Sequence, residues 1–305
     1  MPKLKAHTHY HAPTKHRFGL WLFWSFLIFL LLAGSFLVWV YRGSESSIRN
    51  SVLSAVPFPA AFSGGHIITT SDVFTRFKLA QKSLSSSQKP EATLHRVQDQ
   101  LVYEARLKTI AAKHGVVVTL ADIEAEFNYQ KERATKGDSE KFQQLLFQLY
   151  KIDEKDFKNT ILSPEILLYK LKAWYASKPE LNPEATNKLT SIQKSLATED
   201  FGVLAVKYSE DEATRLTKGN VGSIQLGQTL PELATCIKNA QINKPVVCYS
   251  RYGLHVIKVL SKQADSQNRP NYVVTLQHIF IQPKDFSVWL ANEMQQVPVH
   301  NWLNQ

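Results

Sequence analysis

Two kinds of side chain in this sequence could support chemistry of their own: its cysteines, and a group of histidines close to its start. Only two cysteines occur, Cys236 and Cys248. Their thiols could pair as a disulfide in an oxidising compartment, or they could be two small buried residues, as free cysteines often are. Zinc is not expected there, because two thiols twelve positions apart without nearby partners do not form a tetrahedral ligand set.

The histidines near the start alternate along a short polar tail: His7, His9, His11 and His16. Alternating histidines can bind a metal, but on an unstructured tail we interpret them as solvated polar residues. We therefore expect no metal and no cofactor.

The charge pattern argues against nucleic acid as a partner. The chain has a net charge of +10, with lysines and arginines scattered among acidic residues. No basic stripe is visible, so a solvated surface, attracted to an anionic membrane or cell wall, is the simpler interpretation.

An apolar segment, residues 18–41, contains no charged residue. A membrane-spanning helix needs roughly 20 apolar residues, whereas a signal peptide has an apolar core of ~7–15 residues followed by a cleavage site. The small residues Ala33, Gly34 and Ser35 lie in the middle of this segment, where cleavage is not expected. We therefore predict an uncleaved transmembrane anchor.

The flanking charges predict how the anchor is oriented. Four basic residues precede the segment, whereas one follows it closely: Lys3, Lys5, Lys15, Arg17 and then Arg42. The positive-inside bias therefore favours a single-pass cell-membrane protein with a cytoplasmic tail, residues 1–17, and its functional domains outside the cytoplasm.

Helical patterns follow a juxtamembrane linker, residues 42–62. Thr69 with Asp72, and Thr119 with Asp122, have the spacing of capping boxes, and Gly115 stops a long amphipathic helix. Residues 63–180 are thus expected to form an all-α domain, whose apolar stripes we interpret as core.

After Pro183 the pattern becomes mixed. Helices are expected at 185–197, 201–208 and 231–238, and a loop at the glycines 219, 222 and 227. Strands are expected at 246–249, 252–259 and 272–282, followed by a helix at 286–294. This predicts an α+β domain, residues 181–286, with a small antiparallel sheet, and a C-terminal helix and tail, residues 287–305.

Five short segments of the second domain occur in the order of the parvulin family. Residues 201–211 resemble its F-x-x-L-A-x-x-Y-S-x-D signature, and residues 253–259 resemble G-y-H-I-I-K-V. Between them lie counterparts of three further family segments: 219–222, 230–233 and 245–246. Five ordered matches are specific, although any one alone would be weak.

The first domain is similar to the N-terminal chaperone domain of SurA/PrsA-type foldases. The similarity lies in residues 65–74, in the helix and apolar tail at 105–118, and in residues 166–171. Together the two resemblances imply a PpiC-type peptidyl-prolyl isomerase joined to a chaperone domain.

The parvulin resemblance also implies the site residues. His255 matches one of two family histidines, and Asp211 matches a Cys/Asp position. The substrate pocket is expected to include Val221, Thr229, Leu230 and Leu233. Leu233 stands where an aromatic residue is usual, so the expected pocket is smaller and less aromatic. In this arrangement Cys236 ends the pocket helix and Cys248 lies in the next strand, where the two could approach each other.

The first strand of the family, with its histidine, is missing from its usual place. Residues 172–175 stand there and are better interpreted as the end of a helix. A similar segment, residues 276–281, follows the last strand instead, and its histidine is His278. We hypothesise a permuted parvulin with His278 beside His255. The alternative is an extra edge strand with a chance histidine.

Two functions are therefore expected from the sequence. The first is isomerisation of X-Pro bonds in unfolded or nascent exported polypeptides beside the membrane. The second is a holdase chaperone whose parvulin-like domain only binds extended peptide.

Overall fold

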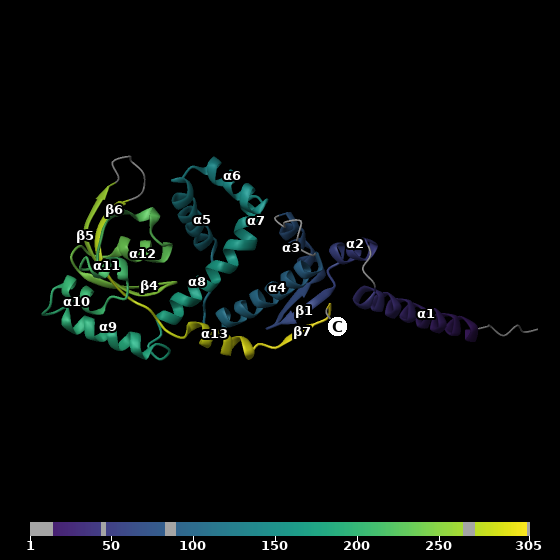
Figure 1. Ribbon diagram of the computed structural model, residues 1–305. Helices are drawn as coiled ribbons and strands as arrows, with labels where there is room; N and C mark the ends of the chain where they lie inside the picture. The colour runs from purple at the N-terminus through teal and green to yellow at the C-terminus, as the bar shows by residue number, and fades with distance from the viewer. Residues whose placement is uncertain (1–14, 44–46, 83–89, 265–271, 304–305) are drawn as a thin grey trace, which may run out of the picture.

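The computed structural model describes residues 15–43, 47–82, 90–264 and 272–303. Helix α1 (Lys15–Arg42) projects from one end of an elongated molecule, and a small β-sheet lies at the other end (Figure 1). A mostly helical region lies between them. The predicted fold class is therefore confirmed: an apolar N-terminal helix, a helical domain and an α+β domain. The predicted histidine tail, residues 1–14, lies outside the described residues.

The helical region begins with α2 (Ser47–Ala55) and a hairpin of β1 (Pro59–Ser63) and β2 (His66–Thr69). The remaining elements follow in order: α3 (Thr70–Lys82), α4 (Pro90–Lys113), α5 (Leu120–Thr135), α6 (Ser139–Tyr150), α7 (Glu154–Phe157), the π-helical turn η1 (Lys158–Leu162) and α8 (Ser163–Ala176). Both predicted capping boxes are present. Thr119 N–H donates to Asp122 Oδ2 (2.7 Å) and Asp122 N–H donates to Thr119 Oγ1 (3.2 Å), and Thr69 with Asp72 repeats the arrangement.

The C-terminal segment returns to the helical region. Helix α13 (Phe286–Gln295) packs Leu290 and Met294 against α4, and β7 (Val299–Asn301) pairs antiparallel with β1. The resulting three-stranded sheet has the order β2-β1-β7. Strands β1 and β7 were not expected from the sequence, because each is too short to show a clear alternation. We call the described parts of residues 47–176 and 286–303 the helical half.

The second region, residues 183–281, is here called the sheet half. Its four strands lie in the antiparallel order β3-β6-β5-β4: β3 (Asn220–Gln225), β6 (Tyr272–Ile281), β5 (Gly253–Ala264) and β4 (Pro245–Ser250). Its helical elements are α9 (Pro183–Ser195), α10 (Phe201–Tyr208), α11 (Glu212–Arg215), the 3₁₀ turn η2 (Leu226–Gln228) and α12 (Pro231–Asn239).

The expectation of a loop at the glycines was wrong for residues 220–225, which form β3. The register between β3 and β6 shifts between Asn220 and Gly222, and Gly222 has φ of +81°. A glycine in this conformation allows a β-bulge, so it bends the strand without ending it.

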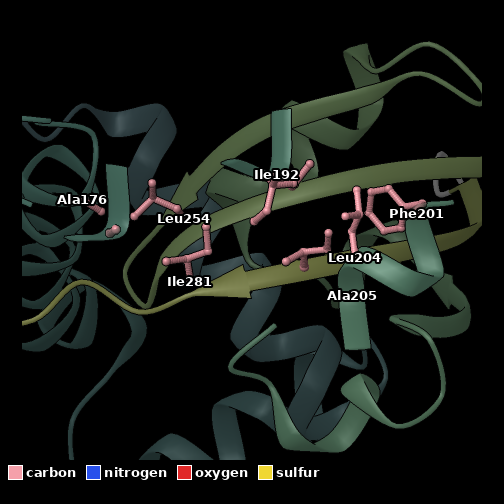
Figure 2. Packing of buried hydrophobic residues seen from close by; sticks show 10 residues of the cluster. Ala176, Ile192, Phe201, Leu204, Ala205, Leu254 and Ile281 are labelled. Atoms are coloured by element: carbon pink, nitrogen blue, oxygen red, sulfur yellow. The ribbon is translucent and has the colours of Figure 1, made fainter. Parts of the chain in front are cut away.

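The two faces of this sheet are covered by different helices. Leu254, Val256, Ile279 and Ile281 point to one face, where they pack against α9 and α10 (Figure 2). Ile257, Val259, Val274 and Leu276 belong to a second apolar layer, under α12. The alternation along β5 and β6 therefore assigns His255, His278 and Phe280 to the face that α12 covers.

The two halves contact each other through α5 and α8. Helix α5 lies against η2 and α12, and α8 lies against β4 and β5. The helical half thus borders the face of the sheet that carries the histidines.

Among the described residues, one helix is long and apolar enough to cross a membrane, Phe23–Arg42, with a mean hydropathy of 2.3 and mostly exposed side chains. Its last turn contacts the helical half: Val40 is fully buried against Leu53 and Phe74, and Arg49 Nε donates to Val40 O (2.9 Å). Residues 47–55 of the predicted linker form α2, so this part of the connection is ordered.

Candidate functional site

The two predicted histidines lie side by side on the sheet. Strand β6 runs antiparallel to β5, so that His255 pairs with Phe280 and Ile257 pairs with His278. The rings of His255 and His278 are stacked, with centroids 6.0 Å apart and planes inclined by 26°. The C-terminal strand thus occupies the place beside β5 that the permutation hypothesis requires, while the catalytic roles of both histidines stay predictions.

His278 belongs to a hydrogen-bonded group with Asp211 and Thr214. Its Nε2 lies 2.7 Å from Asp211 Oδ2 and 2.8 Å from Thr214 Oγ1, and Thr214 Oγ1 donates to Asp211 Oδ2 (2.6 Å). The Thr214 hydroxyl proton is already donated to Asp211, and the Asp211 carboxylate can only accept. His278 Nε2 therefore carries a proton and donates it. This fixes the ring of His278 and leaves its Nδ1 on the other side.

Asp211 is the anion of the site. Burial raises the pKa of its carboxyl, but hydrogen bonds from Thr214 and His278 outweigh burial and hold the pKa below its usual value. Asp211 also accepts the backbone N–H of Ala213 (3.2 Å) at the start of α11. The short helix therefore positions the carboxylate against β6.

His255 is a neutral, buried imidazole. It is 6% exposed, and burial, reinforced by the nearby His278, lowers its pKa to about 3. Its Nε2 lies 2.8 Å from the Oγ of Ser250, which is fully buried and accepts the N–H of Tyr252 (3.1 Å). Among the described residues, His255 Nδ1 has no hydrogen-bond partner.

This network indicates the tautomer of His255. If the Ser250 hydroxyl donates to His255 Nε2, the hydroxyl uses its one proton and the imidazole proton is on Nδ1. The opposite tautomer would leave both the fully buried Ser250 hydroxyl proton and His255 Nδ1 without a partner among the described residues. His255 therefore presents an unpaired Nδ1–H group in an apolar setting.

The predicted pocket residues lie together, but in a packed layer. Leu233 of α12 is 9% exposed and belongs to the apolar layer with Ile257 and Val259 of β5, against which Leu230 and Val221 also pack. The buried Oγ1 of Thr229 has no hydrogen-bond partner among the described residues. Their role in binding substrate stays a prediction.

Cys236 and Cys248 are joined by a disulfide, with Cα atoms 6.0 Å apart. The bond ties α12 to β4, and Cys248 is paired across the strands with His255. The cross-link therefore holds the helix over the face that carries the histidines.

Sequence reasoning missed three residues of this site: Ser250, Thr214 and Phe280. The Phe280 ring lies 5.1 Å from the His255 ring, so an aromatic side chain reaches the site from β6. Alternation along the predicted strand could have placed Phe280 on the face of His278. Thr214 follows Asp211 by three positions, a spacing typical of a helix start. Ser250 had no distinguishing signal.

A cavity of about 710 Å³ opens where the two halves meet. Parts of α8, the β4–β5 turn and the segment after β6 line it, and it includes Tyr252, Gly253 and Gln282. Gly253 is required here: a Cβ at this position would lie 2.6 Å from Ile281 O and 2.5 Å from Pro283 Cδ. The turn therefore lies directly against the end of β6.

Comparison with known proteins finds a domain match that begins at the end of α6 and continues through the sheet half as far as β5. Residues 147–263 match the PPIC-type PPIase domain family, a span that contains His255 and Asp211 and ends before His278. The chain is 29% identical over 175 residues to the foldase protein PrsA of Caldanaerobacter subterraneus subsp. tengcongensis, covering 53% of this chain and 55% of that protein. It is 33% identical over 100 residues to the chaperone SurA of Pseudomonas fluorescens, covering 31% of this chain and 23% of SurA.

This chain thus spans about half the length of that PrsA and about a quarter of that SurA. A crystal structure of the foldase protein PrsA from Streptococcus pneumoniae covers 75% of this chain and 82% of its own, with 14% identity and a TM-score of 0.23. A score this low carries no argument about the fold.

Proposed function

We propose that this chain, which carries a PPIC-type (parvulin) domain and is related to SurA/PrsA-type foldases, isomerises X-Pro bonds in polypeptides outside the cytoplasm. The observation that carries the proposal is the arrangement of His255, His278 and Asp211 on one face of the sheet. It combines a neutral imidazole, a fixed imidazole and a carboxylate beside an aromatic ring, and includes two residues from the matched domain.

The reaction makes and breaks no covalent bond, because it is a rotation about the C–N bond that precedes proline. Rotation about the partial double bond of a peptide has a barrier of about 18–20 kcal/mol. The planar amide owes its large dipole to resonance, and the twisted amide loses that resonance. A site with little water therefore favours the twisted amide relative to bulk water.

The residues of the site fit this requirement. His255 stays neutral and keeps the site apolar. Its ring, with the stacked His278 ring and the neighbouring Phe280 ring, provides flat surfaces on which a proline ring can pack. The Nδ1–H of His255 can donate to the amide nitrogen, whose lone pair becomes available only as the bond twists. Asp211 and Thr214 fix the ring of His278, which in turn lies stacked beside the ring of His255.

Three observations support a location outside the cytoplasm on a membrane. The helix at Phe23–Arg42 is long enough to span, its flanking charges favour a cytoplasmic N-terminus, and the Cys236–Cys248 disulfide suits an oxidising compartment. The burial of Val40 would then hold the helical half close to the bilayer surface. The clients we propose are unfolded or nascent exported polypeptides.

A second candidate, a holdase without isomerase activity, is favoured by an apolar groove on the helical half. This groove of about 370 Å³ lies between α5, α6 and α7, and is lined by side chains that include Tyr129, Phe142, Leu145 and Leu149. Phe147 and Leu149 of α6 are 62% and 58% exposed. Exposed apolar side chains beside a groove suit the capture of unfolded polypeptide.

One experiment separates the two candidates. The full chain in detergent micelles is tested for acceleration of cis–trans isomerisation of a short X-Pro peptide and for suppression of aggregation of an unfolded client. We expect both activities, and we expect His255→Ala to remove isomerisation while sparing suppression. Suppression without isomerisation in the parent chain would leave the holdase.

A further inference from the structure

Arg251 is bound between the helical half and the sheet half. Its Nη1 and Nη2 donate to Glu126 Oε1 (3.1 Å) and Oε2 (2.6 Å) on α5. Its Nε and Nη2 donate to Glu232 Oε1 (2.9 Å) and Oε2 (3.0 Å) on α12. The guanidinium carbon also lies 3.8 Å from the centre of the Tyr169 ring on α8. One side chain thus joins three helices to the β4–β5 turn.

The cluster is largely withdrawn from water. The side chains of Arg251 and Glu126 are 9% and 4% exposed, and that of Glu232 is 23% exposed. Burial raises the pKa of Glu232, but its hydrogen bonds with Arg251 outweigh burial and leave that pKa below its usual value. Arg251 therefore faces two carboxylates in bidentate geometry, the arrangement in which a guanidinium is fixed most tightly.

The same turn holds His255. Ser250 directly precedes Arg251, and its Oγ contacts His255 Nε2. Tyr252 directly follows Arg251, and its backbone N–H donates to the same Oγ. The Arg251 backbone N–H donates to Glu232 Oε1 as well (3.0 Å). The side chain and the backbone of Arg251 therefore both determine where Ser250 lies, and through Ser250 how His255 is oriented.

We propose that Glu126 and Arg251 are positioning residues, through which the helical half fixes the imidazole of His255 in the isomerase site. The expected effect on catalysis rests on the proposed function. The expected effect on the orientation of His255 rests on the contacts alone. This positioning role makes the isomerase site dependent on a helix outside the sheet half. The alternative is that the cluster only docks the two halves and leaves His255 unaffected.

The chain offers a matched control on the same helix. Glu124 pairs with Lys158 Nζ (2.6 Å), and this contact stays within the helical half. Glu124→Gln and Glu126→Gln therefore remove the same charge from α5, but only the second removes a contact with Arg251. Glu124 is more exposed, 56% against 4% for Glu126. Thermal unfolding of each variant is therefore compared first.

The first measurement is steady-state isomerisation of an X-Pro peptide by the full chain in micelles. Misplacement of a catalytic group by about 1 Å can lower a rate by ~100-fold, so we expect Glu126→Gln and Arg251→Lys each to lower kcat about 10-fold or more, with little change in KM. The double variant should fall no further than the more severe single variant, because both changes act through one cluster. Glu124→Gln should stay within about twofold, as an exposed ion pair contributes little.

The second measurement does not need activity. The ¹⁵N chemical shifts of the His255 ring report its tautomer and the Ser250 hydrogen bond. We expect them to change in Glu126→Gln and Arg251→Lys and to stay unchanged in Glu124→Gln. If Glu126→Gln does not fold, Glu126→Asp, which keeps the charge on a shorter side chain, takes its place with a smaller expected change.

The outcomes distinguish the positioning role from the proposed function. Folded Glu126→Gln and Arg251→Lys variants with unchanged His255 shifts and unchanged kcat would overturn the positioning role. A parent chain without isomerase activity, but with His255 shifts that respond to both substitutions, would contradict the proposed function and support the positioning role.

Discussion

The neutral state of buried His255 makes the stability of the fold depend on pH in a defined window. The pKa of His255 is lowered from 6.5 to about 3 in the folded chain, because the ring is buried beside His278. Between these values the unfolded chain binds a proton at this residue and the folded chain does not. The unfolded state therefore gains on acidification, and stability is lost as pH falls below the unfolded pKa.

The magnitude follows from the size of the window. Each pH unit between the two pKa values is worth about 1.4 kcal/mol, so acidification from about pH 6.5 to about pH 5 should cost about 2 kcal/mol of unfolding free energy. The lowered pKa values of Asp211 and Glu232 work in the same direction, but their contributions are lost only at lower pH, as each carboxylate is protonated. The range above about pH 5 therefore isolates His255 from them.

The assay is urea unfolding of the full chain in micelles at several pH values, with His255→Gln as the test variant and His66→Gln, at an exposed position on β2, as the control. We expect His255→Gln to lose most of the acid slope, whatever its absolute stability, and the control to keep it. An equal slope in the parent chain and in His255→Gln would refute the assignment of a neutral, buried His255.

Three further predictions concern the rest of the site and the helical half. His278→Ala should lower kcat/KM for an X-Pro peptide by up to about 100-fold, because loss of the ring stacked beside His255 would shift that imidazole, and an unchanged kcat/KM would contradict its role. Replacing Cys236 and Cys248 by Ser should lower the free energy of unfolding by about 3 kcal/mol in urea titrations, since their bond closes a short loop over the sheet. Leu149→Ser should weaken suppression of client aggregation and leave peptide isomerisation unchanged, and a parallel loss of both would contradict a separate groove.

Local signals predicted most of the helices and the main strands of the sheet. Thr119 with Asp122 is a helix start signal and Gly115 a stop signal, and the physical basis of each lies within a few residues. Helix α10 and strand β6 began where their apolar patterns began. Strand β3 was missed because a glycine that allows a bulge cannot be distinguished from one that ends a strand.

The sequence predicted only part of the site, because only some of its residues lie in local motifs. His255 and Asp211 lie in motifs, and His278 could be inferred because hairpin geometry places β6 beside β5. Ser250 contacts His255 only five positions away, but no motif marks it. Arg251 acts through a contact between segments distant in the chain, since 125 positions separate it from Glu126. No pattern in a single sequence reports which distant carboxylate a guanidinium will meet. The packing of α2 against the end of α1 was likewise not predictable, because no local pattern indicates that Leu53 meets Val40.

The central claim is that the pair of histidines on this sheet belongs to a working isomerase. The most direct test is protease-coupled isomerisation of a short X-Pro peptide by the full chain, beside His255→Ala. The account predicts acceleration over the uncatalysed rate in the parent chain and its loss in the variant. No acceleration by a folded parent chain, or equal acceleration by a folded variant, would contradict it.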